Sequence, residues 1–243
     1  MKISVLSLAG LLAVIALPST VDAKTVKITY TGSVKSGFDE TGEFGAANSS
    51  LDGKSYKAIY TFDDATPGIY TDTFGTFFKE TYGGINYLNV SPVSALLTIN
   101  GIAQSFSGVF NGIAHQENED SSLDKVYHYV EDYNPDGDDY YHDTLYNYIY
   151  SYPNNIVDSI DLTGPLNYAV QDQDHAYGYA KIFHKDYVDD TGLRYAYANL
   201  SPQSVTITAV PEAPTWMTMI AGCGCVGVAL RRRKSKQALA QAL

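Results

Sequence analysis

Hydrophobic and polar residues alternate with a period of two along much of the chain. From Val26 to Tyr30, apolar side chains alternate with Lys27 and Thr29, which is the pattern of a half-buried β-strand. Clusters of Gly, Asn, Asp and Pro, typical of turns, separate such stretches. The pattern predicts strands at 26–30, 56–62, 94–99, 104–110, 126–133, 145–152, 156–162, 177–184 and 203–210. Asn100-Gly101, between two of these, is a strong hairpin signal.

The segment 24–210 contains no convincing helical period in any window of about 12 residues. Many short strands joined by Gly, Asn, Asp and Pro turns predict an all-β fold, an antiparallel β-sandwich of jelly-roll type. The segment has 187 residues, which is the size of one domain with its own core.

The N-terminus has the pattern of a secretory signal peptide. Lys2 precedes an apolar run from Ile3 to Leu17, Pro18 ends this run, and small residues of Val21-Asp22-Ala23 follow. The run is short and ends in a cleavage site, so it is expected to be removed. We therefore expect residues 1–23 to be cleaved and the exported protein to begin at Lys24.

The C-terminal segment has the pattern of a membrane anchor. An almost uncharged apolar run of 17 residues extends from Pro214 to Leu230, about the minimum length for a transmembrane helix. The basic residues after it are expected to stay in the cytoplasm. The strand at 203–210 ends just before this run, so we expect the domain to stand close to the membrane with almost no stalk.

The same tail resembles the PEP-CTERM sorting signal of Gram-negative bacteria, also called the ice-binding protein C-terminal domain. The resemblance covers residues 211–236, and the family usually has a second Pro where this chain has Ala213. It implies recognition by a membrane-embedded exosortase, an inner-membrane intermediate, and delivery to the cell surface or an exopolysaccharide (biofilm) matrix. The matching residues are Pro211, Glu212, Pro214, Trp216, Gly222, Gly224, Gly227, Arg231, Arg232 and Arg233.

The charge of the segment 24–210 limits the classes of partner that it is expected to bind. It has 10 Lys and Arg residues against 25 Asp and Glu residues, a formal charge of −15. This charge opposes binding to nucleic acids and favours binding to cations. Both cysteines, Cys223 and Cys225, lie in the apolar tail, so no disulfide is expected in the exported domain.

Tyrosines are concentrated between Tyr127 and Tyr152, a stretch with nine of the 21 tyrosines of the chain. In a strand, one face would carry the alternating Tyr146, Tyr148, Tyr150 and Tyr152, with Tyr127 and Tyr129 as a shorter row opposite. Such a face offers rings against which sugars stack and hydroxyls that form hydrogen bonds. The alternative is that tyrosine, which favours β-strands, only covers a partly buried sheet face.

A turn rich in carboxylates lies between the two tyrosine rows. Its acidic residues would supply oxygen ligands for Ca²⁺, which accepts flexible geometry, although no EF-hand pattern is present. Hairpin chemistry alone also explains the Asp-Gly turn. The candidate ligands are Asp136, Asp138, Asp139 and Asp143.

Motifs for catalysis are absent: the chain has no G-x-S-x-G elbow, H-E-x-x-H motif or P-loop. His142 and Asp143 are adjacent, but neighbours on a strand point to opposite faces. We therefore expect no enzymatic activity. The sequence favours a structural or adhesive protein of the surface or matrix. The alternatives are a carbohydrate-binding module for exopolysaccharide and a secreted hydrolase.

Overall fold

The computed structural model describes residues 25–66, 69–119, 123–134, 140–184 and 194–210. These residues form an antiparallel, all-β structure, which confirms the predicted fold class. The one helical element among them is a 3-10 turn, η1 (Ile85–Tyr87). Within the described ranges, no helix has the length and apolar character needed to cross a membrane. The predicted signal peptide (1–23) and transmembrane helix (214–230) lie outside them.

Thirteen strands make up the structure. Their bounds are β1 (Thr25–Asp39), β2 (Ser49–Ser50), β3 (Ser55–Asp63), β4 (Tyr70–Phe74), β5 (Phe78–Gly83), β6 (Val93–Ile99), β7 (Ile102–Phe106), β8 (Asn111–Glu119), β9 (Leu123–Asn134), β10 (Tyr141–Ser151), β11 (Leu166–Ala169), β12 (His175–His184) and β13 (Arg194–Ala209).

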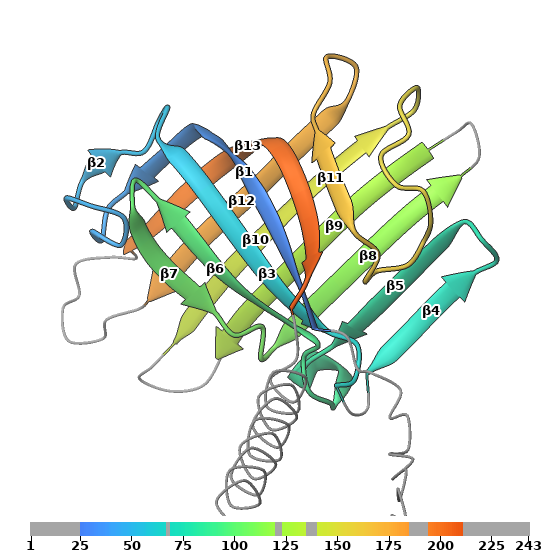
Figure 1. The fold of residues 1–243 in the computed structure, drawn as a ribbon. Coiled ribbons are helices and arrows are strands. Elements are labelled where there is room, and N and C mark those ends of the chain that lie inside the picture. Colours follow the sequence, from blue (N-terminus) through green and yellow to red (C-terminus); the bar gives the residue numbers. More distant parts are fainter. Residues whose placement is uncertain (1–24, 67–68, 120–122, 135–139, 185–193, 211–243) are drawn as a thin grey trace, which may run out of the picture.

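All thirteen strands belong to one continuous sheet with the order β4-β5-β8-β9-β10-β12-β13-β1-β3-β6-β7, while β11 pairs with β13 and β2 pairs with β1. The sheet curls, so that β3, β6 and β7 lie in front of β9, β10 and β12 (Figure 1). The predicted jelly-roll sandwich of two separate sheets is therefore not what is observed: one curled sheet forms both layers, because hydrogen bonding continues from one layer into the other.

The strands β1 and β13 explain this continuity. They are 15 and 16 residues long and pair with each other from Val26–Ala209 to Asp39–Ala196. Register shifts interrupt the pairing at Thr31/Gly32 and Val34/Ser36. Bulges of this kind increase local twist and bend a strand. The bent strands β13 and β1 lie between β12 and β3 in the sheet, and the curl of the sheet passes through them.

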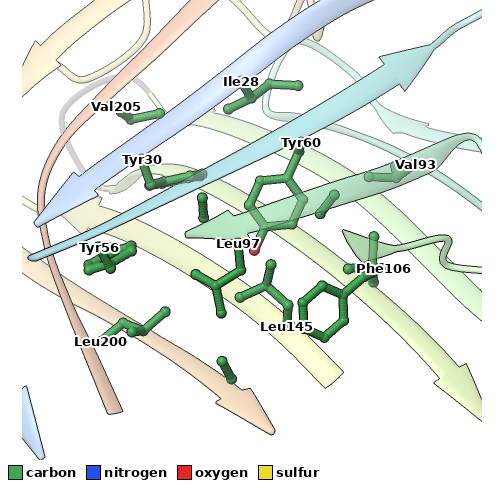
Figure 2. Close-up of a cluster of buried hydrophobic side chains, with 14 of the residues drawn as sticks. Ile28, Tyr30, Tyr56, Tyr60, Val93, Leu97, Phe106, Leu145, Leu200 and Val205 are labelled. Atoms are coloured by element: carbon green, nitrogen blue, oxygen red, sulfur yellow. The ribbon is translucent and has the colours of Figure 1, made fainter. Parts of the chain in front are cut away.

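The core lies between the two layers and is filled by the inward side chains of nearly every strand. Ile28 of β1, Tyr60 of β3, Leu97 of β6, Leu145 of β10 and Leu200 of β13 are all at most 1% exposed, and Figure 2 shows how they converge. Burying a side chain of this size contributes about 1.5–3 kcal/mol. This apolar interior is the main source of stability that holds the layers together.

A polar network crosses the same core. The Tyr30 hydroxyl lies 2.9 Å from Nδ1 of His128. The Tyr56 hydroxyl donates to Oδ1 of Asn147 at 3.0 Å, and Nδ2 of Asn147 donates to the Tyr60 hydroxyl at 2.9 Å. Buried polar groups are costly unless they are paired. These bonds therefore fix how β1 and β3 sit over β9 and β10.

Local predictions mostly agree with the observed elements. The hairpin at Asn100-Gly101 is confirmed, with φ values of 53° and 83° that suit a type I′ turn. The predicted strand at 156–162 is wrong, because this segment is a loop. Ile156, Val157 and Leu162 are buried as expected for a strand. However, the N–H groups of Ile156 and Val157 donate to the Asp124 carboxylate instead of to a neighbouring strand.

Candidate functional site

The strand β10 separates apolar and phenolic side chains between its two faces. Leu145, Asn147 and Ile149 point into the core and are fully buried, whereas Tyr146, Tyr148 and Tyr150 are half-buried on the opposite face. Tyr152 follows just past the end of the strand and is 62% exposed. The predicted row of four phenols is thus present, and it lies on the outer face, away from the core.

Neighbouring strands extend this row into a grid, because directly paired residues of antiparallel strands share a face. Tyr148 is flanked by Tyr127 of β9 and Tyr177 of β12. Tyr146 is flanked by Tyr129 and Tyr179 in the same way. The row of Tyr127 and Tyr129 was expected from the sequence. The third row was missed, although the strand prediction at 177–184 already placed two alternating tyrosines on one face.

The rings of the grid contact one another. Ring centroids are 5.8 Å apart for Tyr148–Tyr150, 5.8 Å for Tyr148–Tyr177 and 6.5 Å for Tyr129–Tyr146. Aromatic pairs at such distances attract each other beyond the effect of area burial. The phenols therefore hold each other in place before any ligand arrives.

A hollow of about 500 Å³ opens on this face between the tyrosine rows of β9 and β10. Its volume lies within the range of small-molecule sites, about 300–1,000 Å³. Mostly aromatic walls with a few polar tips are also typical of such sites. The lining residues are Leu123, Lys125, Tyr127, Tyr129, Tyr146, Tyr148, Tyr150 and Tyr152.

Four tyrosine hydroxyls of the hollow stay protonated at neutral pH. Burial raises the pKa of Tyr146 to about 12, with the neighbouring Tyr177 adding to the effect. Burial likewise raises the pKa of Tyr127, Tyr129 and Tyr148. Each neutral phenol both donates and accepts hydrogen bonds. Among the lining residues, Lys125 is the one cation, and its Nζ lies 5.5 Å from the centre of the Tyr127 ring.

An imidazole between two carboxylates lies on the same face beside Tyr127, with which His115 is paired. Nδ1 of His115 is 3.1 Å from Oε2 of Glu80, and Nε2 is 3.4 Å from Oε2 of Glu117. Glu80 comes from the distant strand β5, so sequence alone gave no signal for this cluster. Both ring nitrogens are engaged within the protein, and the cluster fixes the strands of this face.

The adjacent pair His142 and Asp143 is divided between two faces, as strand geometry requires. Nε2 of His142 lies 2.7 Å from Oε1 of Glu131. Oδ1 of Asp143 accepts the N–H of Phe183 at 2.9 Å. The structure therefore does not bring these two side chains together as a base and its orienting partner.

The other predicted site residues mostly lie outside the described ranges. Asp136, Asp138 and Asp139 belong to this group, so calcium binding at that turn stays a prediction. The same holds for the sorting signal at 211–236. Within the part of the chain that the structure describes, no three His, Cys, Asp or Glu side chains are grouped to hold a metal ion.

Several acidic residues instead hold loops in place. The buried carboxylate of Asp39 accepts the N–H groups of Gly42, Glu43 and Phe44 at 2.6–3.0 Å. Asp132 accepts the N–H of Val109 at 2.7 Å in the same manner. Part of the acidic excess therefore satisfies loop backbone groups, and the formal charge alone overstates the carboxylates that are free for cations.

Comparisons of this chain with family models, curated proteins and solved structures found no match.

Proposed function

We propose that this protein is an exported adhesive protein, held in the membrane by its tail until the tail is processed, whose β-domain binds a polysaccharide of the cell surface or matrix. The observation that carries the proposal is the tyrosine-lined hollow on the outer face of β9 and β10. The tail supports the location, because it resembles a sorting signal that exosortase substrates carry. The carbohydrate-binding role and the adhesive role are then one activity of the same surface.

The chemistry of the hollow suits a sugar chain. A sugar ring has apolar C–H faces that pack on aromatic rings and hydroxyls that need hydrogen-bond partners. The hollow supplies both through protonated phenols, and its ring contacts reduce the ordering cost of binding. The formal charge of −15 between 24 and 210 disfavours nucleic acid, which is the main polymeric alternative.

Lys125 makes the hollow suitable for an acidic sugar as well as a neutral one. Its ammonium group lies at one end of the lining and is held near the Tyr127 ring. A carboxylate on the polysaccharide would pair with it, in a domain that otherwise repels anions. We therefore expect the site to discriminate acidic from neutral polymers through this one side chain.

Binding is tested with the double variant Tyr148→Ala/Tyr150→Ala on a panel of neutral and acidic polysaccharides. We expect affinity to fall at least about tenfold, equivalent to 1.4 kcal/mol, since two of the rings that line the hollow are lost. Isothermal titration calorimetry measures the affinity, and thermal unfolding checks the fold. Because both rings are half-buried, the loss of stability should stay below the roughly 3–5 kcal/mol per residue of a core Phe→Ala change.

The matched control is Tyr195→Ala/Tyr197→Ala. These rings lie 5.7 Å apart on β13, outside the hollow, so binding should not change. A third variant, Lys125→Met, should weaken the binding of acidic polymers alone. The proposal is wrong if the parent protein binds no polysaccharide of the panel, or if the control pair weakens binding as much as the Tyr148/Tyr150 pair.

A further inference from the structure

The chain leaves the β-domain at the same end as the loop between β5 and β6. The N–H of Val210 donates to the carbonyl oxygen of Thr25 at 2.8 Å. Thr25 pairs with Asp63, and the N–H of Asp63 donates to the carbonyl oxygen of Pro92 at 3.0 Å. Figure 1 shows η1 beside the start of β1 and the end of β13. This loop is therefore next to the residue from which the C-terminal tail continues.

This loop and the neighbouring segment between β7 and β8 present apolar side chains to solvent. Leu88 is 95% exposed, and Ile85, Val90 and Val109 are 46–63% exposed. We call these four residues the apolar tip; the N–H of Ile85 donates to the carbonyl oxygen of Val109 at 2.8 Å, which joins its two segments. From Thr81 to Ala114 the sequence has no charged residue and no histidine. A cluster of this kind on a strongly acidic protein marks a contact surface.

Leu88 is unfavourable in the isolated domain for two reasons. Its φ of 60° and ψ of 30° lie in the left-handed region, which is strained for a bulky residue and suits Gly or Asn. Its side chain also makes almost no contact that would offset this strain, because it is nearly fully exposed. An observed backbone outlier of this kind points to a functional contact.

The tail indicates what the apolar tip contacts. Pro214, where the apolar run of the tail begins, is four residues after Val210, and four residues span at most about 14 Å. Anchoring of 214–230 would therefore hold this end of the domain against the bilayer. We propose that the apolar tip inserts into the surface of the lipid bilayer that holds segment 214–230. This inference rests on the proposed membrane anchoring and is independent of polysaccharide binding.

The surroundings of the apolar tip fit a neutral lipid surface. Tyr82 and Tyr87 are in contact next to it, with ring centroids 4.8 Å apart, and tyrosine is enriched at membrane interfaces. The nearby acidic residues Asp63 and Asp64 at the end of β3 disfavour anionic lipids. Phosphatidylcholine is accordingly the lipid of choice for a test.

This contact would orient the tyrosine hollow away from the membrane. The N–H of Phe110, beside the apolar tip, donates to the carbonyl oxygen of Glu131 on β9. The hollow extends along β9 from Tyr129 to Leu123, in the direction away from Glu131. Leu123 is eight residues from Glu131, or about 26 Å along an extended strand. The Leu123 end of the hollow would thus lie away from the membrane.

A tryptophan reporter tests the contact in the chain from Lys24 to Leu243. Leu88→Trp is introduced with Trp216→Phe, which removes the native tryptophan, and the protein is reconstituted into vesicles of brominated phosphatidylcholine. We expect strong quenching of the emission of Trp at position 88. Ile85→Trp is a second reporter in case the first variant does not fold, as judged by circular dichroism.

The matched control is Ile102→Trp in the same background. Ile102 is 40% exposed but lies at the start of β7, at the far end of β6 from Pro92, so its emission should not be quenched. If the protein floats with the vesicles but the Trp at position 88 or 85 is not quenched, the contact of the apolar tip is refuted while the anchoring stands. Absence of flotation refutes the anchoring and the contact together. Equal quenching at position 102 also overturns the proposal, as does a lipid-independent dimer that buries position 88.

Discussion

Single residues in the core combine apolar packing with polar specificity. His128 is buried on the inner face of β9, with its ring 5.4 Å from that of Tyr60 and Nδ1 bonded to the Tyr30 hydroxyl. Burial, together with the charge of His115, lowers the pKa of His128 to about 3. The imidazole is therefore neutral in the native protein under ordinary conditions, and this makes stability depend on pH.

The direction in which stability changes with pH follows from the protonation of His128 in the native and the unfolded protein. Below pH 6.5, the ordinary pKa of histidine, the unfolded chain binds a proton at His128 that the native protein does not bind until about pH 3. The free energy of unfolding should thus fall as the pH drops through this window, by up to about 1.4 kcal/mol per pH unit. Urea denaturation between pH 7 and pH 4 measures the slope.

The variant His128→Phe removes the titrating group while keeping a ring in the core. Its stability at pH 7 should fall, since the Tyr30 hydroxyl loses a partner. Between pH 6.5 and pH 4, its free energy of unfolding should change less steeply with pH than that of the parent. The difference in slope should be at most that of one bound proton, about 1.4 kcal/mol per pH unit. Identical slopes would show that His128 binds a proton equally in the native and the unfolded protein over this pH range, which contradicts the prediction.

Among the elements, β1 and β13 are the ones that shape the sheet, and Gly32 permits their close approach at the first register shift. A Cβ at Gly32 would lie 2.0 Å from the carbonyl oxygen of Ser201 and 2.9 Å from Cε1 of Tyr56. Gly32 stands at the register shift after Thr31. The bulge that bends β1 therefore depends on the absence of a side chain at this position.

The variant Gly32→Ala should consequently lose about 2–4 kcal/mol of stability, because backbone atoms of β13 must move to accommodate the methyl group. Gly164→Ala is the control, since its Cβ would come no closer than 3.1 Å to any atom, and it should change stability by less than about 1 kcal/mol. Chemical denaturation compares the two. Similar effects at both positions would mean that β1 and β13 separate easily at the bulge.

At the scale of the whole molecule, the sequence places a tail with the pattern of an anchor and sorting signal directly after the β-domain. The strand β13 continues to Ala209, and only Val210 separates it from Pro211 and Glu212 of the predicted signal. The expectation that the domain has almost no stalk stays a prediction, because the tail lies outside the described residues. The parts of the tail differ in chemistry, so changes to each should have different effects.

Replacing Pro211 and Glu212 leaves the apolar run untouched. Membrane insertion should persist, but exosortase cleavage should fail and leave a heavier, cell-bound form. Intact-mass analysis of the surface protein, from cells with and without an exosortase, measures this outcome. The same analysis of the exported form checks for an N-terminus at Lys24.

The comparison variant neutralises Arg231, Arg232 and Arg233. It removes the charge that keeps the C-terminus in the cytoplasm, so orientation or retention should fail instead. If Pro211 and Glu212 can be replaced without any change in mass or location, the tail is a membrane anchor and not a sorting signal.

What the sequence determined by itself is local. Period-two alternation predicted most strands because it reflects which side chains of one strand face the core, and it placed Tyr146, Tyr148 and Tyr150 on a common face. The hairpin at Asn100-Gly101 was predictable because its turn is also local: it is defined by two adjacent residues with positive φ.

Tertiary structure decided whether those faces point inward or outward and what meets on them. The tyrosine row is part of a grid because the registers of β9, β10 and β12 place Tyr127 and Tyr177 on either side of Tyr148. The segment 156–162 was predicted as a strand because an apolar loop and a buried strand have the same local composition. Their difference is the hydrogen-bond partner, here Asp124. Long-range packing determines which group becomes this partner, and the local alternation of apolar and polar residues carries no information about that packing.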